Sequence, residues 1–279
     1  MKTITSITEM QQWSQAARSA GKVISLVPTM GFLHEGHVSL MRDGKKRGDV
    51  LVISIFVNPT QFGLGEDYEE YPRDLRGDSE KSLEAGVDII FAPSVAEMYP
   101  SGYQTYVNVE KVTQNLCGFS RPTHFRGVTT VVAKLFNIVQ PHVAIFGEKD
   151  YQQLIAIRQM GKDLDFGIDI VGAPIVREKD GLAMSSRNKY LSIEERKAAL
   201  CLNGALRRAK ELSKNGEVNA QKLIEEAAKI INAEPLTEID YIKICNPETI
   251  EDIKTIKDKA VMALAVKIGK TRLIDNQIL

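Results

Sequence analysis

The segment from Val23 to His37, VISLVPTMGFLHEGH, is the most informative part of this chain. Its first five residues form a short apolar run rich in β-branched side chains, which is typical of a buried strand. Pro28 ends the run, Gly31 marks a turn, and the apolar residues after His37 recur at helical spacing. The segment therefore predicts a strand, a turn and the beginning of a helix.

The turn carries two of the chain's four histidines, His34 and His37, with Gly36 between them. A helix that begins here directs unpaired backbone N–H groups and its positive dipole end at the space above the strand. Such an end binds anions, most often phosphate, and two imidazoles add further donors. A plain surface turn and a metal site are the alternatives, although no nearby Cys or acidic motif would complete a metal shell.

Two later segments also suit a polyphosphate. The sequence FGEKDYQQ, residues 146–153, follows the apolar run Val143–Ile145 and precedes a helical stretch. The sequence MSSRN, residues 184–188, offers two hydroxyls and one guanidinium. Each segment taken alone is more typical of a solvated turn or loop than of a binding site.

In this order, the three segments resemble the HIGH-type nucleotidyltransferase superfamily, in which the His-x-Gly-His turn and a downstream basic serine loop hold ATP. The resemblance is closest to the pantothenate synthetase family, the pantoate–β-alanine ligases. It runs from about the first strand to the C-terminus. The motifs that carry it are PTMGFLHEGH (28–37), IFVNPTQF (55–62), RPTHFRGV (121–128), FGEKDYQQ (146–153) and MSSRN (184–188).

The resemblance implies an ATP-dependent ligase that condenses pantoate with β-alanine. A carboxylate does not react with an amine at neutral pH, so the implied route passes through a pantoyl-adenylate, with release of pyrophosphate and then of AMP. Two alternatives stay open. One is a nucleotidylyltransferase that transfers AMP to a phosphorylated small molecule, which would need a second phosphate pocket. The other is a nucleotide-binding module without catalysis.

Negative charge that builds on the α- and β-phosphate oxygens calls for fixed donors and cations. The implied catalytic residues are His37 and His34 at the α/β-phosphate region, and Lys149 and Arg187 on the β- and γ-phosphates. Asp150 suits the ribose hydroxyls. The implied ATP-binding set is Met30, His34, Gly36, His37, Gly147, Lys149, Asp150, Val176, Met184, Ser185, Ser186 and Arg187.

Uncharged amides match the hydroxyls and carboxylate of pantoate without neutralising the nucleophile. We therefore expect Gln61, Gln153 and Asn58 to bind pantoate, and Gln61 to bind β-alanine as well. Mg²⁺ is expected to bridge the phosphates with few protein contacts. Asp78 is the candidate protein contact, while Gly77 stands where the family often carries a further carboxylate.

Length and periodicity predict the architecture. A chain of 279 residues is long for one core and suggests two domains. Strands alternate with helices in residues 1–175, which predicts a Rossmann-like, doubly wound parallel sheet (α/β) whose ligands bind beyond the carboxyl ends of its strands. The resemblance implies that ATP and pantoate bind to this domain. Residues 176–279 predict a smaller α+β lid domain, opened by a capping box at Ser192.

Composition limits the partners. Lys plus Arg equals Asp plus Glu at 36 each, which argues against nucleic acid or an anionic membrane as a partner. Three scattered cysteines without a CxxC, and no membrane-length apolar run, favour a reduced cytoplasmic setting.

The resemblance implies a homodimer, for which the apolar segments 53–56 and 107–109 are candidate contacts. His124 and His142 are expected to be structural.

Overall fold

The computed structural model describes residues 1–279, which form two compact units. The first unit comprises residues 1–109, 121–148 and 156–174. The second unit comprises residues 110–120, 149–155 and 175–279. No helix is long and apolar enough to cross a membrane.

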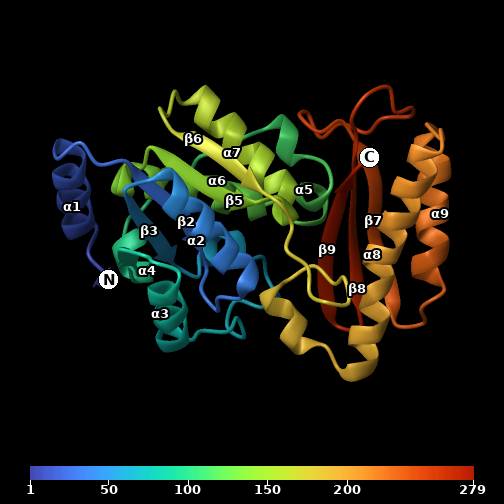
Figure 1. The fold of residues 1–279 in the computed structure, drawn as a ribbon, viewed down its shortest axis with the longest axis horizontal. Coiled ribbons are helices and arrows are strands. Elements are labelled where there is room, and N and C mark those ends of the chain that lie inside the picture. The colour runs from blue at the N-terminus through green and yellow to red at the C-terminus, as the bar shows by residue number, and fades with distance from the viewer. The chain divides into compact units, whose positions relative to one another are not determined.

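The first unit is built on six parallel strands in the order β1-β4-β3-β2-β5-β6 (Figure 1). This arrangement confirms the predicted doubly wound α/β sheet. Its strands are β1 (Lys2–Ile4), β2 (Ile24–Thr29), β3 (Val50–Ile55), β4 (Ile89–Phe91), β5 (Val143–Gly147) and β6 (Asp169–Ala173). The connecting α-helices are α1 (Ile7–Ser19), α2 (Glu35–Arg47), α3 (Leu75–Glu84), α4 (Val95–Met98), α6 (His124–Val139) and α7 (Tyr151–Asp163), whose first turn belongs to the second unit.

Helix α2 lies across the central strands and forms one face of the core (Figure 1). Its Leu40 and Met41 pack with Val27, Leu51 and Ile53 in one buried cluster. A Cβ added at Gly44 of α2 would lie 2.8 Å from a methyl group of Leu51, so a larger residue there would require the Leu51 side chain or the helix to shift. Each fully buried aliphatic side chain of this kind contributes about 1.5–3 kcal/mol.

The strand order places the switch point of the sheet between β2 and β5. The chain leaves β2 through α2 to β3 on one side, and later returns to β5 on the other side of β2. In sheets of this kind ligands bind beyond the carboxyl ends of the strands at such a point. The His34–His37 turn follows β2 and the 3₁₀ turn η1 (Pro59–Gln61) follows β3, so both stand at this edge.

The second unit pairs two helices with a three-stranded antiparallel sheet, as the sequence predicts (Figure 1). Its elements are η2 (Lys111–Thr113), α5 (Cys117–Ser120), η4 (Ser186–Tyr190), α8 (Ile193–Lys214), α9 (Ala220–Asn232), β7 (Thr237–Cys245), β8 (Val261–Ile268) and β9 (Thr271–Ile278). The predicted capping box is present: Ser192 N–H donates to Glu195, and Glu195 N–H donates to the Ser192 hydroxyl. Strands β8 and β9 pair as an antiparallel hairpin.

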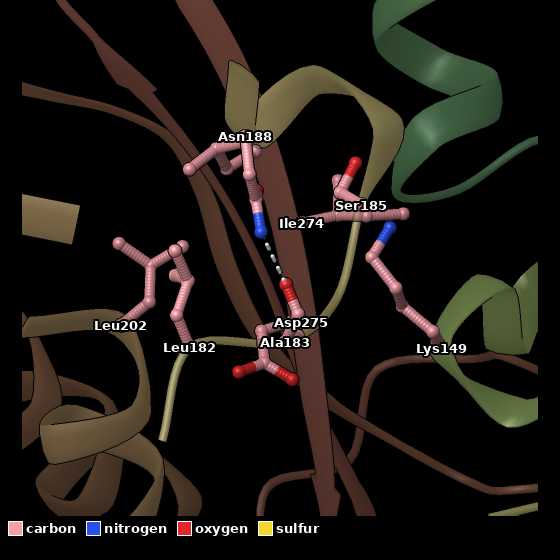
Figure 2. Close-up of a pocket in the computed structure, with 9 residues that line it drawn as sticks. Lys149, Leu182, Ala183, Ser185, Asn188, Leu202, Ile274 and Asp275 are labelled. Carbon is pink, nitrogen blue, oxygen red and sulfur yellow. Dashed lines mark hydrogen bonds between the residues drawn. The ribbon is translucent and has the colours of Figure 1, made fainter. Parts of the chain in front are cut away.

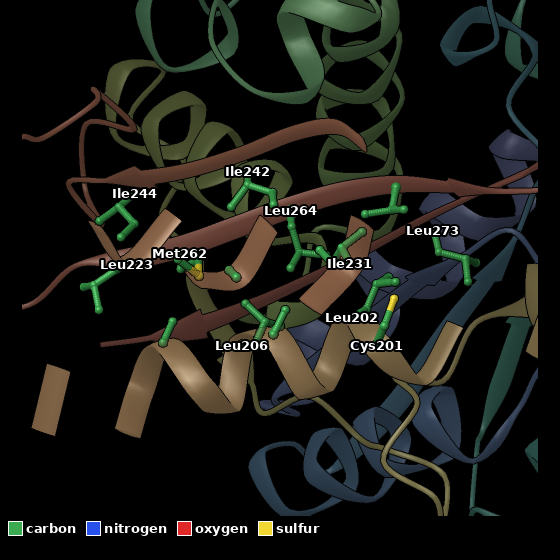
Figure 3. Close-up of a cluster of buried hydrophobic side chains, with 14 of the residues drawn as sticks. Cys201, Leu202, Leu206, Leu223, Ile231, Ile242, Ile244, Met262, Leu264 and Leu273 are labelled. Atoms are coloured by element: carbon green, nitrogen blue, oxygen red, sulfur yellow. The ribbon is translucent and has the colours of Figure 1, made fainter. Parts of the chain in front are cut away.

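The core of the second unit lies between the helix pair and the sheet. Figure 3 shows Leu202 and Leu206 of α8 facing Met262 and Leu264 of β8. Leu206, Met262 and Leu264 have no exposed surface. Cys201 packs in the same cluster, and all three cysteines are buried free thiols.

Two expectations about the first unit need correction. Strand β1 was not predicted, because its three residues are too few to show a period. Segment 53–56 is not a dimer surface: Ile53 and Ser54 have no exposed surface, because β3 is an interior strand between β2 and β4. In segment 107–109, Val109 is buried as well.

His142 joins β2 and β5 at the amino end of the sheet. Its Nδ1 accepts a hydrogen bond from Ile24 N–H at 3.0 Å, and its own backbone N–H donates to the Ile24 carbonyl at 2.8 Å. Burial, with the charge of Arg18, lowers the pKa of His142. The acceptor role requires a neutral ring, so His142 is structural, as expected.

This contact predicts a pH-dependent stability. The folded pKa of His142 lies below its unfolded value, so its contribution is complete above about pH 6.5 and declines as the pH falls through that value. In His142→Asn, the amide oxygen replaces the acceptor and does not titrate. We expect its urea midpoint to fall less than that of the wild type between pH 7.5 and 5.5. An equal fall in both proteins would contradict this account.

Candidate active site

The two histidines at the end of β2 form a close pair of rings inclined at 35° to each other. His34 is the extended residue that precedes α2, and His37 is the third residue of the helix. The His34 N–H donates to Nδ1 of His37 at 3.3 Å, and the ring centroids lie 4.0 Å apart. Because Nδ1 of His37 accepts, the proton of the neutral ring resides on Nε2, which is therefore a hydrogen-bond donor.

The loop before His34 adopts an unusual backbone. Gly31 has a φ of +82°, and Phe32 has a φ of +51°, in the left-handed region that non-glycine residues seldom adopt. The Gly31 N–H donates to the Thr29 hydroxyl at 3.1 Å. A Cβ at Gly31 would lie 2.9 Å from a carboxylate oxygen of Asp78, so only glycine fits this position.

Asp78 of α3 accepts two hydrogen bonds from the backbone of this loop. Its Oδ2 accepts from Phe32 N–H at 2.8 Å and its Oδ1 accepts from Leu33 N–H at 2.7 Å. The residue is only 1% exposed, and burial raises the pKa of its carboxyl group while the two N–H donors oppose that rise. The expected Mg²⁺ contact by Asp78 stays a prediction, and these bonds already engage both of its oxygens.

The amides that follow β3 form a connected group. Gln61 donates from Nε2 to the sulfur of Met30 at 3.1 Å, and its Oε1 accepts from Asn58 at 3.2 Å. Asn58 is 1% exposed, donates to the Gly127 carbonyl and accepts from the Tyr99 hydroxyl. The structure thus brings together Met30, Asn58 and Gln61, and it gives Asn58 the task of fixing Gln61.

Helix α6 supports the same turn. A Cβ at Gly127 would lie 2.3 Å from the Thr60 carbonyl oxygen, so this glycine lets α6 contact the turn directly. The Gln61 carbonyl lies 2.8 Å from Nδ1 of His124 and accepts from Arg121 at 3.1 Å. His124, expected to be structural, therefore fixes the backbone of a predicted substrate contact.

Arg121 also holds the segment that follows. Its Nε donates to Glu66 at 2.7 Å, and the two side chains form a partly buried ion pair. Although burial raises the pKa of Glu66, the hydrogen bond and charge of Arg121 lower it below its ordinary value. The pair anchors the segment that follows η1.

Gly147 is the last residue of β5 in the first unit, and the other predicted residues belong to the second unit. Lys149, Asp150 and Gln153 lie in residues 149–155, and the others lie beyond residue 175. The Lys149 carbonyl accepts from Asn276 at 3.0 Å, and the Tyr151 hydroxyl donates to the Pro247 carbonyl at 3.2 Å. The beginning of α7 is thereby fixed to the C-terminal part of the chain.

Gln152 completes this attachment and was missed by the sequence analysis. It is buried, its Oε1 accepts from Cys117 N–H at 3.0 Å, and its Nε2 donates to the carbonyls of Val112 and Asn115. Gln152 and Gln153 are adjacent identical residues, so only the direction of each side chain separates the structural amide from the predicted substrate contact.

The MSSRN loop is ordered by its own contacts. Ser185 precedes η4, and its hydroxyl accepts from Arg187 N–H at 3.3 Å. Met184 N–H donates to the Val176 carbonyl at 3.0 Å. Asn188 donates to Glu178 at 2.8 Å and to the Ala183 carbonyl at 3.1 Å. Beside the loop, Arg177 donates to both carboxylate oxygens of the buried Asp275.

A small pocket in the second unit joins two predicted phosphate-binding residues. In Figure 2 the Lys149 side chain extends in the direction of Ser185, and both residues line this pocket. The cavity volume of about 10 Å³ suits roughly one water molecule, so this is a junction of side chains and no nucleotide cleft. The lining residues are Lys149, Leu182, Ala183, Ser185, Asn188, Leu202, Leu273, Ile274 and Asp275.

Comparison with known proteins finds similarity along the whole chain. Residues 2–278 match the family model for pantoate-beta-alanine ligase. Pantothenate synthetase of Geotalea uraniireducens is 60% identical over 279 residues, covering 100% of this chain and 99% of the relative. That of Syntrophus aciditrophicus is 57% identical over 278 residues, with 100% and 97% covered.

Solved structures of similar proteins superpose on this chain over nearly its whole length. Pantothenate synthetase from Thermus thermophilus superposes with a TM-score of 0.93 at 45% identity, covering 99% of each chain. Pantoate-beta-alanine ligase from Francisella tularensis, complexed with beta-gamma ATP and beta-alanine, superposes with a TM-score of 0.82 at 33% identity, covering 100% of this chain and 97% of that chain.

Proposed function

Since this chain belongs to the pantoate–beta-alanine ligase family, we propose that it condenses pantoate with β-alanine at the expense of ATP. In the first step a pantoate carboxylate oxygen bonds to the α-phosphorus, and the bond from that phosphorus to pyrophosphate breaks. In the second step the neutral amine of β-alanine bonds to the acyl carbon, the bond to AMP breaks, and the amine releases a proton.

The observation that carries this proposal is the histidine pair at the end of β2. His37 presents an Nε2–H donor from the first turn of α2. Donors fixed where charge develops on a transferring phosphoryl group need no rearrangement during the reaction. We assign His37, with His34, to the α/β-phosphate region. The ATP-bearing relative from Francisella tularensis supports a nucleotide as the anion.

The second unit supplies the remaining phosphate contacts in this proposal. Lys149 and Arg187 hold the β- and γ-phosphates as cations, and Ser185 and Ser186 donate from hydroxyl or backbone. Asp150 binds the ribose hydroxyls. The other proposed ATP contacts are Met30, Gly36, Gly147, Val176 and Met184. On this view the second unit serves as a lid (176–279 in the sequence-based division) over a nucleotide- and pantoate-binding domain (1–175).

The amide group after β3 supports pantoate as the acid. Gln61 offers an uncharged donor and acceptor whose position is fixed by Met30 and Asn58. An amide binds hydroxyls and a carboxylate without neutralising the nucleophile, as a lysine would. We assign pantoate to Gln61, Gln153 and Asn58, and β-alanine to Gln61. A second phosphate substrate would call for cations, whereas the donors here are amides.

Mg²⁺ is part of the proposal as a companion of ATP. No three His, Cys, Asp or Glu side chains gather in an arrangement that could hold a metal ion. The donor set therefore fits an ion held mainly by phosphate oxygens and water, with Asp78 the candidate protein contact from the sequence. Such an ion would neutralise charge on the phosphates.

The expected assembly and location are also proposals. We propose that the chain acts in the cytoplasm as a homodimer, which its family suggests. Sedimentation velocity tests the proposed homodimer: a species near twice the chain mass of 31.0 kDa is expected at working concentration. A single species at the monomer mass would contradict it.

Pantoate-dependent exchange of pyrophosphate into ATP tests the proposed function. We expect exchange with pantoate, ATP and Mg²⁺ in the absence of β-alanine, because the adenylate forms before the amine is needed. A nucleotidylyltransferase or a binding module would show no exchange that depends on pantoate. Exchange that requires β-alanine would contradict a free adenylate step.

Substitution of the two glutamines tests the pantoate assignment. We expect Gln61→Ala and Gln153→Ala to weaken pantoate binding more than ATP binding. Each change leaves a substrate group unpaired, which costs about 1–3 kcal/mol. Gln152→Ala is the matched control, because its buried amide holds residues 112–117: it should lower the thermal midpoint, while Gln153→Ala should not. Equal weakening of both substrates in the Gln61 and Gln153 variants would contradict the assignment.

A further inference from the structure

The loop of residues 31–33 cannot hold its conformation by local preference. Phe32 occupies the left-handed region at φ +51°, which costs a non-glycine residue about 1–2 kcal/mol. Its N–H and that of Leu33 both donate to the side chain of Asp78 on α3. A backbone of this kind persists only where neighbouring groups impose it.

Two side chains of α3 impose it through three successive peptide groups. The Asp78 carboxylate accepts from the N–H groups of Phe32 and Leu33, and the Lys81 ammonium donates to the Leu33 carbonyl at 2.8 Å. Asp78 is 1% exposed, and its carboxylate packs so closely against the loop that a Cβ at Gly31 would lie 2.9 Å from its Oδ2. Leu33 is thus held at both its N–H and its carbonyl, immediately before His34.

We propose that Asp78 is a positioning residue for the first half-reaction, acting through residues 32 and 33 to set His34 and His37. This inference rests on the proposed function. It gives Asp78 a different task from the Mg²⁺ contact expected from the sequence, because its two oxygens are occupied by backbone donors. A misplacement of about 1 Å at such a site can lower a rate by about 100-fold.

The variant that tests this is Asp78→Asn, in which an NH₂ group replaces one acceptor and faces a backbone N–H. We expect it to lower the rate of pantoate-dependent exchange about 10- to 100-fold, with KM for ATP and pantoate changed less than about threefold. Lys81→Met, which leaves the buried carboxylate in place, should lower the rate in the same direction by about threefold.

Asp74→Asn is the matched control on the same helix. Asp74 caps α3 through a bond to Gly77 N–H at 3.0 Å, and Asn caps a helix as well as Asp does. This variant also loses one carboxylate from α3, but it does not touch the loop. We expect exchange at the wild-type rate. A loss equal to that of Asp78→Asn would show that charge or helix stability is responsible, and would overturn the proposal.

A double-mutant cycle separates positioning from general destabilisation. If Asp78 acts through His37, Asp78→Asn should cost no more than about twofold in rate when His37 is already Ala. A full additional loss in the His37→Ala background would overturn the proposal. The Mg²⁺ concentration for half-maximal exchange should be the same in Asp78→Asn and the wild type. A higher requirement, relieved by excess Mg²⁺, would instead establish Asp78 as a metal contact.

The outcomes distinguish this inference from the proposed function. If the wild type shows no pantoate-dependent exchange, the proposed function fails. If the wild type exchanges and Asp78→Asn exchanges equally well, only the positioning role fails. If Asp78→Asn does not fold, Lys81→Met replaces it in the double-mutant cycle with His37→Ala. An additive loss of exchange rate in that cycle would overturn the proposal.

Discussion

Two hydrogen bonds to a buried carboxylate determine how the chain leaves the central strand of its sheet. Asp78 accepts from two successive backbone N–H groups, at Phe32 and Leu33, and so holds a left-handed residue directly before α2. The beginning of that helix, and with it the orientation of His34 and His37, follows from where the loop ends. A carboxylate 45 residues away from Leu33 in the sequence therefore sets the direction in which α2 begins.

The same logic recurs at the neighbouring strand. The turn after β3 is fixed by Asn58, whose amide is satisfied inside the protein, and by the closeness of α6 that Gly127 permits. Gln61 is held by Met30 from the β2 turn and by Asn58 from its own turn. The parallel sheet supplies the common edge, and buried polar groups convert that edge into defined positions for side chains.

Much of this could be predicted from residues alone because the signals are local. Strand–turn–helix junctions, the capping box at Ser192 and the hairpin of β8 and β9 each depend on a few adjacent residues, and all are present. The tasks of Asp78 and Gln152 could not be predicted. Each depends on which backbone groups lie opposite a side chain in the folded chain, at separations of 45 residues for Leu33 and 35 residues for Cys117. Sequence spacing carries no signal for such contacts.

The central claim is that the β2 turn stabilises charge in adenylate formation and has no comparable part in amine transfer. Single-turnover measurements on His37→Ala test it most directly, because they time the two half-reactions separately. The account predicts that formation of pantoyl-adenylate slows by about 10²–10³, while preformed pantoyl-adenylate reacts with β-alanine at nearly the wild-type rate. An equal fall in both half-reactions would contradict it and would show that His37 shapes the site or serves the amine.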